Sequence, residues 1–150
     1  MAITDDGQLG EKLAFNFFWE HGKNHTKCFQ IDLMVYDKKH GDFIVEVKFQ
    51  DIFVKPPFDG HGLSPTQVKA RLDFYDRTKI PCLFLVFDKN KEYIYYQWLH
   101  ILEQGNKFTT KGKKIRTIYD INNFNKKKWS PNLLEIANDF YKNLGVIAIK

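Results

Sequence analysis

Residues 43–50, FIVEVKFQ, are the stretch that decides the fold. Every second residue from Phe43 onward is a large apolar side chain, and the residues between them include Glu46 and Lys48. This period-two alternation is typical of a β-strand that packs one set of side chains into the core and presents the other set on the opposite face. The stretch therefore predicts a strand on which a carboxylate and an ammonium group share one face.

An antiparallel partner for this strand is predicted immediately upstream. Residues 27–37, KCFQIDLMVYD, are rich in β-forming side chains, and the turn residues KKHG follow them. Two such runs around a short turn that contains glycine predict a β-hairpin. With the turn centred near Lys39, Asp32 lies directly across from Glu46, and directly opposed residues have Cβ atoms about 4.5–5.5 Å apart.

Asp32 and Glu46 are expected to share a metal ion, because two carboxylates at this distance repel each other strongly unless a cation lies between them. Mg²⁺ is the natural occupant, since it prefers oxygen ligands and is typically held by one or two carboxylates together with substrate phosphate. Lys48 lies on the same face as Glu46 and about 6.6 Å further along the strand. From there its ammonium group can reach a metal-bound water or a phosphate oxygen.

The rest of the sequence predicts one mixed α/β domain. Serine followed by proline, at Ser64-Pro65 and again at Ser130-Pro131, is typical of a helix N-cap with proline at the first helical position. The run IPCLFLVF is continuously apolar, as expected for a buried central strand. The expected elements are a helix at 6–21, strands at 27–37 and 43–50, a Gly- and Pro-rich loop at 51–63, a helix at 64–78, strands at 80–87 and 92–99, a hairpin at 108–119 about Lys111-Gly112, and a last helix at 130–144.

The arrangement of Asp32 and then Glu46-Val47-Lys48 on adjacent antiparallel strands resembles the active site of the PD-(D/E)xK nuclease superfamily. The core of that family is a helix, three antiparallel strands, a helix and a strand, and the resemblance implies this order through about residue 98. One departure is that Ile31, not proline, precedes Asp32. The resemblance implies an α/β (α+β) restriction-endonuclease-like fold, a mixed central sheet flanked by helices in αβββαβ order, with a C-terminal hairpin and helix. One domain would span 1–150, with the core at about 6–98 and additions for DNA contact or oligomerisation at about 99–150.

The resemblance also implies roles for individual residues. Asp32 and Glu46 would bind Mg²⁺, for which Mn²⁺ would substitute, with the Val47 carbonyl as a further ligand. Glu11, in the predicted first helix, would complete the site or hold a second ion. Lys48 would orient or help to deprotonate the attacking water. Some members carry a glutamine on the helix after the Glu-x-Lys strand; Gln67 lies at that place and would position water or phosphate, or else is a solvated helix residue.

The charge of the chain favours a polyanionic partner. Lys and Arg total 23 against 18 Asp and Glu, which gives a net charge of +5. Neutralising phosphates with basic side chains releases counterions and drives binding to nucleic acid. The basic residues crowd the last third of the chain, within 107–128, where they either contact DNA through a hairpin or form a solvated face. The candidate DNA-binding residues there are Lys107, Lys111, Lys113, Lys114 and Arg116, joined by Lys55 and His61 in the 51–63 loop, for which an exposed loop position without a ligand is the alternative.

Four aromatic residues of the strand at 92–99 also permit two interpretations. Tyr93, Tyr95, Tyr96 and Trp98 could form a stacking platform for bases, but strand alternation favours a role in the core and at an interface. The two cysteines, Cys28 and Cys82, have no C-x-x-C spacing and are expected to be buried thiols in a reducing compartment.

These observations favour a soluble, cytoplasmic, DNA-associated enzyme. No apolar run approaches the ~20 residues of a membrane span. The expected activity is site-selective, Mg²⁺-dependent cleavage of double-stranded DNA of the homing or restriction type, by a homodimer or homotetramer whose C₂ symmetry would suit a near-palindromic target. The alternatives are a Holliday junction resolvase of the same fold, which cuts branched DNA, and a catalytically inactive, basic DNA-binding protein.

Overall fold

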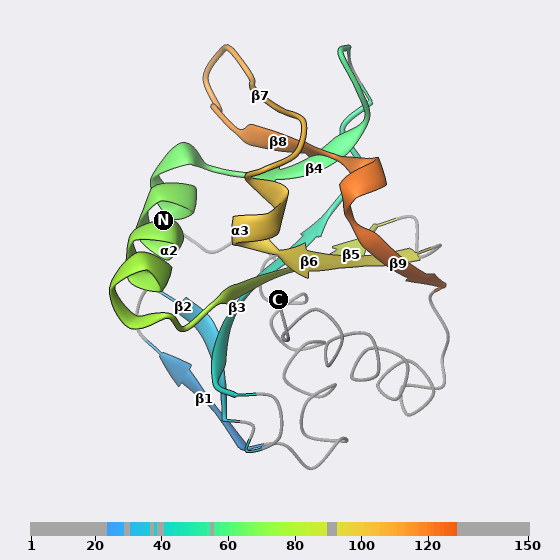
Figure 1. The fold of residues 1–150 in the computed structure, drawn as a ribbon. Coiled ribbons are helices and arrows are strands. Elements are labelled where there is room, and N and C mark those ends of the chain that lie inside the picture. The colour runs from blue at the N-terminus through green and yellow to red at the C-terminus, as the bar shows by residue number, and fades with distance from the viewer. Residues whose placement is uncertain are drawn as a thin grey trace.

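The computed structural model describes residues 24–28, 31–36, 38, 41–54, 56–89 and 93–128. They form a mixed α+β fold, mostly of strands (Figure 1). The large sheet has the order β1-β2-β3-β5-β6-β9, and a smaller sheet has the order β4-β8-β7. The strands are β1 (Asn24–Cys28), β2 (Ile31–Tyr36), β3 (Phe43–Gln50), β4 (Gly60–Leu63), β5 (Cys82–Asp88), β6 (Tyr93–Trp98), β7 (Lys107–Thr109), β8 (Thr117–Asp120) and β9 (Asn125–Lys128); the helices are α2 (Pro65–Thr78), α3 (Leu99–Leu102) and the 3₁₀ helix η1 (Ile121–Asn123).

Strand β3 lies in the middle of the large sheet and has the alternation that the sequence predicts. It pairs with β2 in the antiparallel sense and with β5 in the parallel sense. Parallel neighbours require a crossover, and helix α2 provides it. Every residue of β5 is buried, which confirms the predicted central strand. Because α2 returns the chain to the start of β5, it runs opposite to β3, and its N-terminal half lies near the carboxyl end of that strand.

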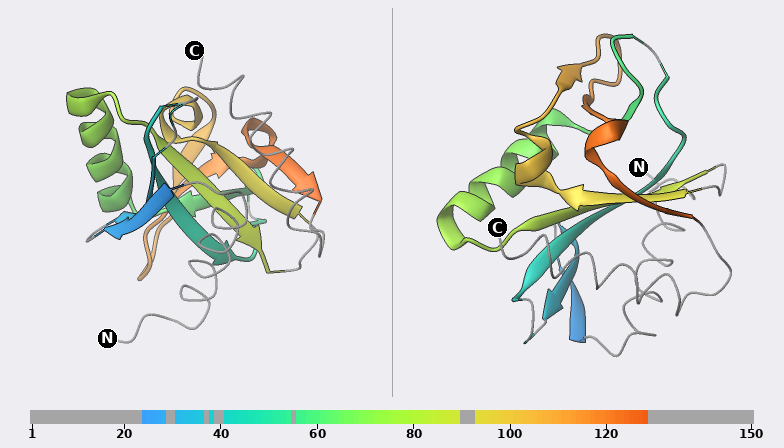
Figure 2. Two further views of the ribbon diagram at one scale, coloured as in Figure 1. Left: turned by 90° about the horizontal axis from the view of Figure 1, so that it is seen from below. Right: turned by 45° about the vertical axis from the view of Figure 1, so that its right-hand side comes forward.

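Both faces of the large sheet carry buried apolar side chains. Phe43, Val45 and Val47 belong to one cluster, which also contains Trp98. Ile44 belongs to a second cluster on the other face, the face on which Glu46 also lies. This second cluster includes residues of α2, α3 and the small sheet, and Figure 2 shows these elements on the same side of the large sheet. Glu46 and Lys48 therefore point from the sheet towards the layer that α2 and the small sheet form.

Helix α2 begins and ends as the sequence predicts. The Ser64 side chain accepts a hydrogen bond from the Gln67 backbone N–H, and proline occupies the first helical turn. The helix ends at Thr78, where Lys79 adopts a left-handed conformation with φ of 61° and its N–H donates to the Tyr75 carbonyl. The first N–H groups and the last carbonyl groups of a helix have no partner within it, and such caps commonly satisfy them.

Strand β6 confirms the assignment of its aromatic residues to the core. Tyr95, Tyr96 and Trp98 are buried, and Trp98 packs edge-on against Phe43 with ring centroids 5.5 Å apart. The predicted hairpin at 108–119 is present as β7 and β8, with Gly112 at φ of 113° in the loop between them. The Cys82 thiol is buried, as expected, whereas the side chain of Cys28 lies outside the described part of the chain.

The prediction of a single strand at 27–37 is wrong. Two antiparallel strands, β1 and β2, cover this region, and Cys28 pairs directly with Ile31, so the chain reverses within a few residues. Residues 29–30 of the sequence include neither glycine nor proline, so the sequence has none of the residues that usually signal a turn there. Strand β9 was not predicted either; it pairs with β6 and extends the large sheet.

The prediction that 51–63 is entirely loop is also wrong at its end. Residues 60–63, GHGL, form β4, which pairs with β8. The two glycines allow an unusually close approach, because a Cβ at Gly60 would lie 2.0 Å from the Tyr119 carbonyl oxygen and one at Gly62 would lie 2.2 Å from that of Thr117. Here glycine indicates close packing of two strands, not a turn.

The predicted helices at 6–21 and 130–144 lie outside the described residues. Within the described ranges, no helix is long and apolar enough to cross a membrane.

Candidate functional site

The polar face of β3 carries the candidate catalytic residues. Glu46 is buried, with 2% of its surface exposed, and Lys48 and Gln50 are half-buried further along the same face. The register pairs Leu33 of β2 with Val45 of β3. Continued by one residue, this register would set Asp32 opposite Glu46. The side chain of Asp32 and the whole of Glu11 lie outside the described part of the chain.

Arg71 of helix α2 supplies the positive charge that faces Glu46. Its Nε donates to Glu46 Oε1 over 2.6 Å, and 11% of the Arg71 side chain is exposed. A buried carboxylate without a nearby cation is strongly disfavoured, so this pair accounts for the presence of Glu46 inside the protein. Sequence reasoning did not single out Arg71. The signal was available, since Arg71 follows Gln67 by four residues and residues four apart share a helix face.

The donor chemistry at this place fits Mg²⁺. The Glu46 and Asp32 carboxylates would supply oxygen ligands, and Val47 would supply a carbonyl from the same strand. The Arg71 guanidinium balances the negative charge of the Glu46 carboxylate. Among the side chains that the structure describes, no group of three His, Cys, Asp or Glu residues could hold a metal; the proposed set includes two carboxylates whose side chains fall outside that part.

Gln67 has a structural partner at the start of α2. Its side-chain oxygen accepts a hydrogen bond from the Ser64 hydroxyl over 3.2 Å, while its backbone N–H donates to the same hydroxyl oxygen over 3.2 Å. The pair thus forms a reciprocal helix cap, a role that the sequence analysis did not assign to Gln67. Gln67 is half-buried and lies one helical turn before Arg71.

His61 is not the exposed loop residue that the sequence suggested. It lies in β4 with 0% of its surface exposed, so it presents no surface to DNA. Its Nδ1 lies 3.0 Å from Gln50 Oε1, and its Nε2 lies 3.5 Å from Oδ2 of the buried Asp88 at the end of β5. The Gly62 N–H donates to the same Gln50 oxygen over 3.3 Å. Because an amide oxygen only accepts, this hydrogen bond is donated by the His61 Nδ1–H group to Gln50 Oε1.

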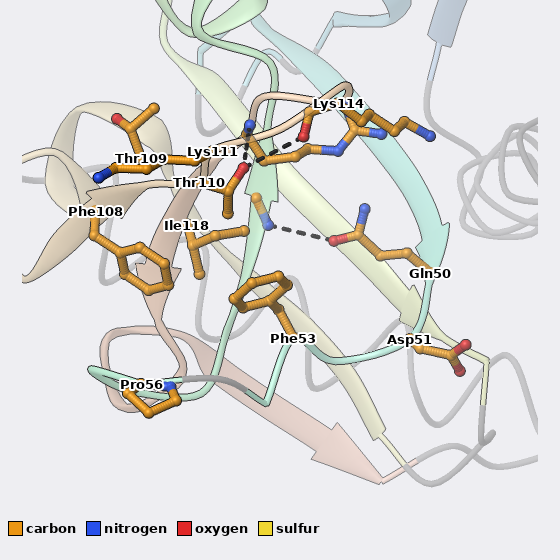
Figure 3. Close-up of a pocket in the computed structure, with 12 residues that line it drawn as sticks. Gln50, Asp51, Phe53, Pro56, Phe108, Thr109, Thr110, Lys111, Lys114 and Ile118 are labelled. Atoms are coloured by element: carbon orange, nitrogen blue, oxygen red, sulfur yellow. Dashed lines mark hydrogen bonds between the residues drawn. The ribbon is translucent and has the colours of Figure 1, made fainter.

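These contacts fix the Gln50 side chain at the carboxyl end of β3. Both contacts made by His61 and Gly62 fall on the amide oxygen, which leaves the amide NH₂ group facing the other way. Figure 3 shows that this nitrogen is turned towards the side on which Lys114 lies. The sequence signal for the cluster was weak, because a histidine between two glycines reads as a loop residue.

A cavity of about 580 Å³ opens beside Gln50. Figure 3 shows Lys111 and Lys114 along one edge, with the rings of Phe53 and Phe108 along the other. Arg116 also lines the cavity, and partial burial lowers the pKa of its guanidinium. Three of the predicted DNA-binding residues, Lys111, Lys114 and Arg116, are thus brought together. The cavity is lined by Gln50, Asp51, Phe53, Pro56, Gly62, Phe108, Thr109, Thr110, Lys111, Lys114, Arg116 and Ile118.

The other predicted DNA contacts are placed differently. Lys107 forms an ion pair with Glu103 and lines a second cavity of about 510 Å³ beside α2. Glu103 also accepts a hydrogen bond of 2.7 Å from the Tyr119 hydroxyl, and burial together with this carboxylate raises the pKa of Tyr119. Lys113 is exposed in the β7–β8 loop and does not line the first cavity. Lys55 lies outside the described residues.

Comparison of the chain with protein-family models and with curated proteins finds no match.

Proposed function

We propose that this protein is a Mg²⁺-dependent DNA endonuclease of the PD-(D/E)xK type, acting site-selectively on double-stranded DNA as a homodimer or homotetramer. The observation that carries the proposal is the polar face of β3. It presents a buried carboxylate at Glu46 and an ammonium group at Lys48, and Asp32 holds the register position opposite Glu46. A protein that only bound DNA would gain nothing from two carboxylates beside Lys48, because carboxylates repel phosphates.

The place of these residues in the sheet supports the same conclusion. In open sheets with parallel strands, ligands bind beyond the carboxyl ends of those strands. The carboxyl ends of β3 and β5 lie side by side, since Gln50 pairs with Asp88. The order of β1, β2, β3, α2 and β5 is also the order of three antiparallel strands, a helix and a strand, with β4 inserted before the helix.

Each residue has a distinct task in the proposed reaction. Asp32, Glu46, the Val47 carbonyl and Glu11 would hold Mg²⁺, which when bound acidifies a water and polarises the phosphate. Lys48 either orients the attacking water by donating a hydrogen bond from its ammonium group or, as the neutral amine, takes up the proton of that water and becomes the ammonium. In both cases the ammonium charge offsets the negative charge that develops on the phosphate oxygens. Arg71 holds the Glu46 carboxylate in a fixed orientation from the side of the helix.

Removal of the metal gives the direct test. Supercoiled plasmid and a synthetic four-way junction are incubated with the full-length protein in Mg²⁺, in Mn²⁺ and in EDTA. We expect cleavage in both metals and none in EDTA, because the carboxylates alone cannot activate water at neutral pH. Cutting of the plasmid at discrete positions would support a site-selective endonuclease, and cutting of the junction alone would support a resolvase. Undiminished cutting in EDTA, or DNA binding without any cutting in Mg²⁺, would contradict the proposal, and the latter result would identify a non-catalytic DNA-binding protein.

A further inference from the structure

We propose that the cavity beside Gln50 holds a single unpaired nucleotide of the DNA substrate, with its base against Phe53 and Phe108 and its phosphate against Lys111, Lys114 and Arg116. This inference rests on the proposed function for the identity of the polymer, and it adds the class of substrate: DNA in which one nucleotide lies outside the double helix.

One side of the cavity is aromatic, as the base of a nucleotide requires, and the other is basic, as its phosphate requires. The apolar side contains Phe53 and Phe108, whose ring centroids lie 5.8 Å apart at an interplanar angle of 52°. Phe58 packs edge-on against Phe108 at 5.0 Å and supports that ring from the side. Both Phe53 and Phe108 are half-buried, so each ring is held by neighbours while it lines the cavity. Partly buried aromatic rings commonly stack against an unpaired base, and they do so with any of the bases.

The opposite edge of the cavity carries the charge for a phosphate. Lys111, Lys114 and Arg116 contribute three cations, against one acid, the exposed Asp51. The loop that bears them is held in shape by Thr110, whose side-chain oxygen accepts from the Arg116 N–H over 2.8 Å and donates to the Lys114 carbonyl over 3.3 Å. The cations are therefore presented by an internally bonded loop.

Gln50 links this cavity to the candidate catalytic face. His61 and Gly62 both bond to its amide oxygen, so the NH₂ group remains as a hydrogen-bond donor on the cavity side. Gln50 lies two residues beyond Lys48, about 6.6 Å further along the strand. A nucleotide in the cavity would thus be a close neighbour of the phosphate at Lys48, and Gln50 would donate to its phosphate or to a carbonyl of its base.

The size of the cavity suits a single nucleotide. A volume of about 580 Å³ lies in the range of sites that enclose one small molecule. A base within a duplex is stacked and paired, and it can enter such a site only by leaving the helix. This rearrangement costs least for a base that is already unpaired. We therefore expect the protein to prefer branched, bulged or locally opened DNA over a fully matched duplex.

Binding of labelled DNA in EDTA, followed by fluorescence anisotropy, tests this proposal without cleavage. One duplex is fully matched, and the other has the same sequence with a single extra thymidine. We expect the full-length protein to bind the bulged duplex about tenfold more tightly, as loss of stacking on one base commonly changes affinity by this amount or more. Phe108→Leu and Phe53→Leu should remove the preference while they keep an apolar side chain. Tyr36→Leu, at an exposed aromatic residue on β2, is the matched control and should retain it.

Each result decides the proposal. Equal affinity for the two duplexes, or a loss in the Phe variants that is the same for both duplexes, would overturn it. Competition by free thymidine monophosphate at the concentration of the bulged DNA would also overturn it, because the cavity would then be a site for a free nucleotide. The plasmid assay in Mg²⁺ is independent of these outcomes. Cleavage without a preference for the bulged duplex would support the nuclease activity and contradict the nucleotide site. A preference for the bulged duplex without cleavage would support the nucleotide site and contradict the nuclease activity.

Discussion

Replacing Glu46 with glutamine is expected to lower the rate of Mg²⁺-dependent DNA cleavage by on the order of a thousandfold. The amide is nearly identical in shape to the carboxylate but has no negative charge to hold the metal against its hydration shell. Its oxygen can still accept the hydrogen bond that Arg71 Nε now donates to Glu46. The variant should therefore fold, and the loss of rate should reflect the site itself. The rate is measured under single-turnover conditions on the substrate that the wild-type protein cuts best.

Binding measurements and matched variants separate this loss from damage to the fold. Affinity for the same DNA in EDTA should be unchanged or slightly increased in Glu46→Gln, because one negative charge has been removed near the phosphates. Asp42→Asn, an acid-to-amide change at an exposed residue just before β3, should cleave at the wild-type rate. Lys48→Ala should lose about a hundredfold or more in rate. Wild-type cleavage by Glu46→Gln would show that the metal, and hence the reaction, is elsewhere.

The local pattern of the sequence was sufficient to predict β3 and α2. The alternation of 43–50 placed Glu46 and Lys48 on one face, and both side chains do share that face. Ser64 and Pro65 marked the start of α2 because a cap and a missing N–H act over a few neighbouring residues. The register of β2 against β3, with Leu33 opposite Val45, followed from the predicted position of one turn. Each of these features depends on contacts that are close in sequence.

Features that depend on contacts distant in sequence were not predictable in the same way. His61 is buried because β8 packs against β4 at the two adjacent glycines, and nothing within FDGHGL indicates that neighbour. The pairing of Arg71 with Glu46 joins residues 25 positions apart, and it requires the direction of α2 across the sheet. The cavity likewise exists only because the β7–β8 loop comes near the end of β3. The sequence predicted the basic residues of that loop but not the aromatic side facing them.

Replacing Arg71 with alanine is expected to lower the free energy of unfolding by about 3–5 kcal/mol at neutral pH in EDTA, since it leaves the Glu46 carboxylate buried without its cation. The measurement is urea denaturation followed by circular dichroism. Arg77→Ala is the matched control, because Arg77 is an exposed arginine on the same helix, and its loss should change stability by less than about 0.5 kcal/mol. The double variant Arg71→Ala/Glu46→Gln should recover part of the loss, as expected for two residues in direct contact.

The same variants connect stability to the proposed metal site. If Mg²⁺ binds at Glu46, it should stabilise Arg71→Ala more than the wild type. In the variant the Glu46 carboxylate has lost the positive charge of Arg71, and the ion replaces that charge. A ligand that binds only the folded state stabilises it in proportion to the logarithm of its concentration over its dissociation constant. The denaturation midpoint of Arg71→Ala should therefore rise with millimolar Mg²⁺, and this rise should be absent from Arg71→Ala/Glu46→Gln. An equal shift of the denaturation midpoint by Mg²⁺ in the wild type and both variants would place the ion away from Glu46. This measurement requires neither substrate nor turnover, so its result is independent of the DNA cleavage assay.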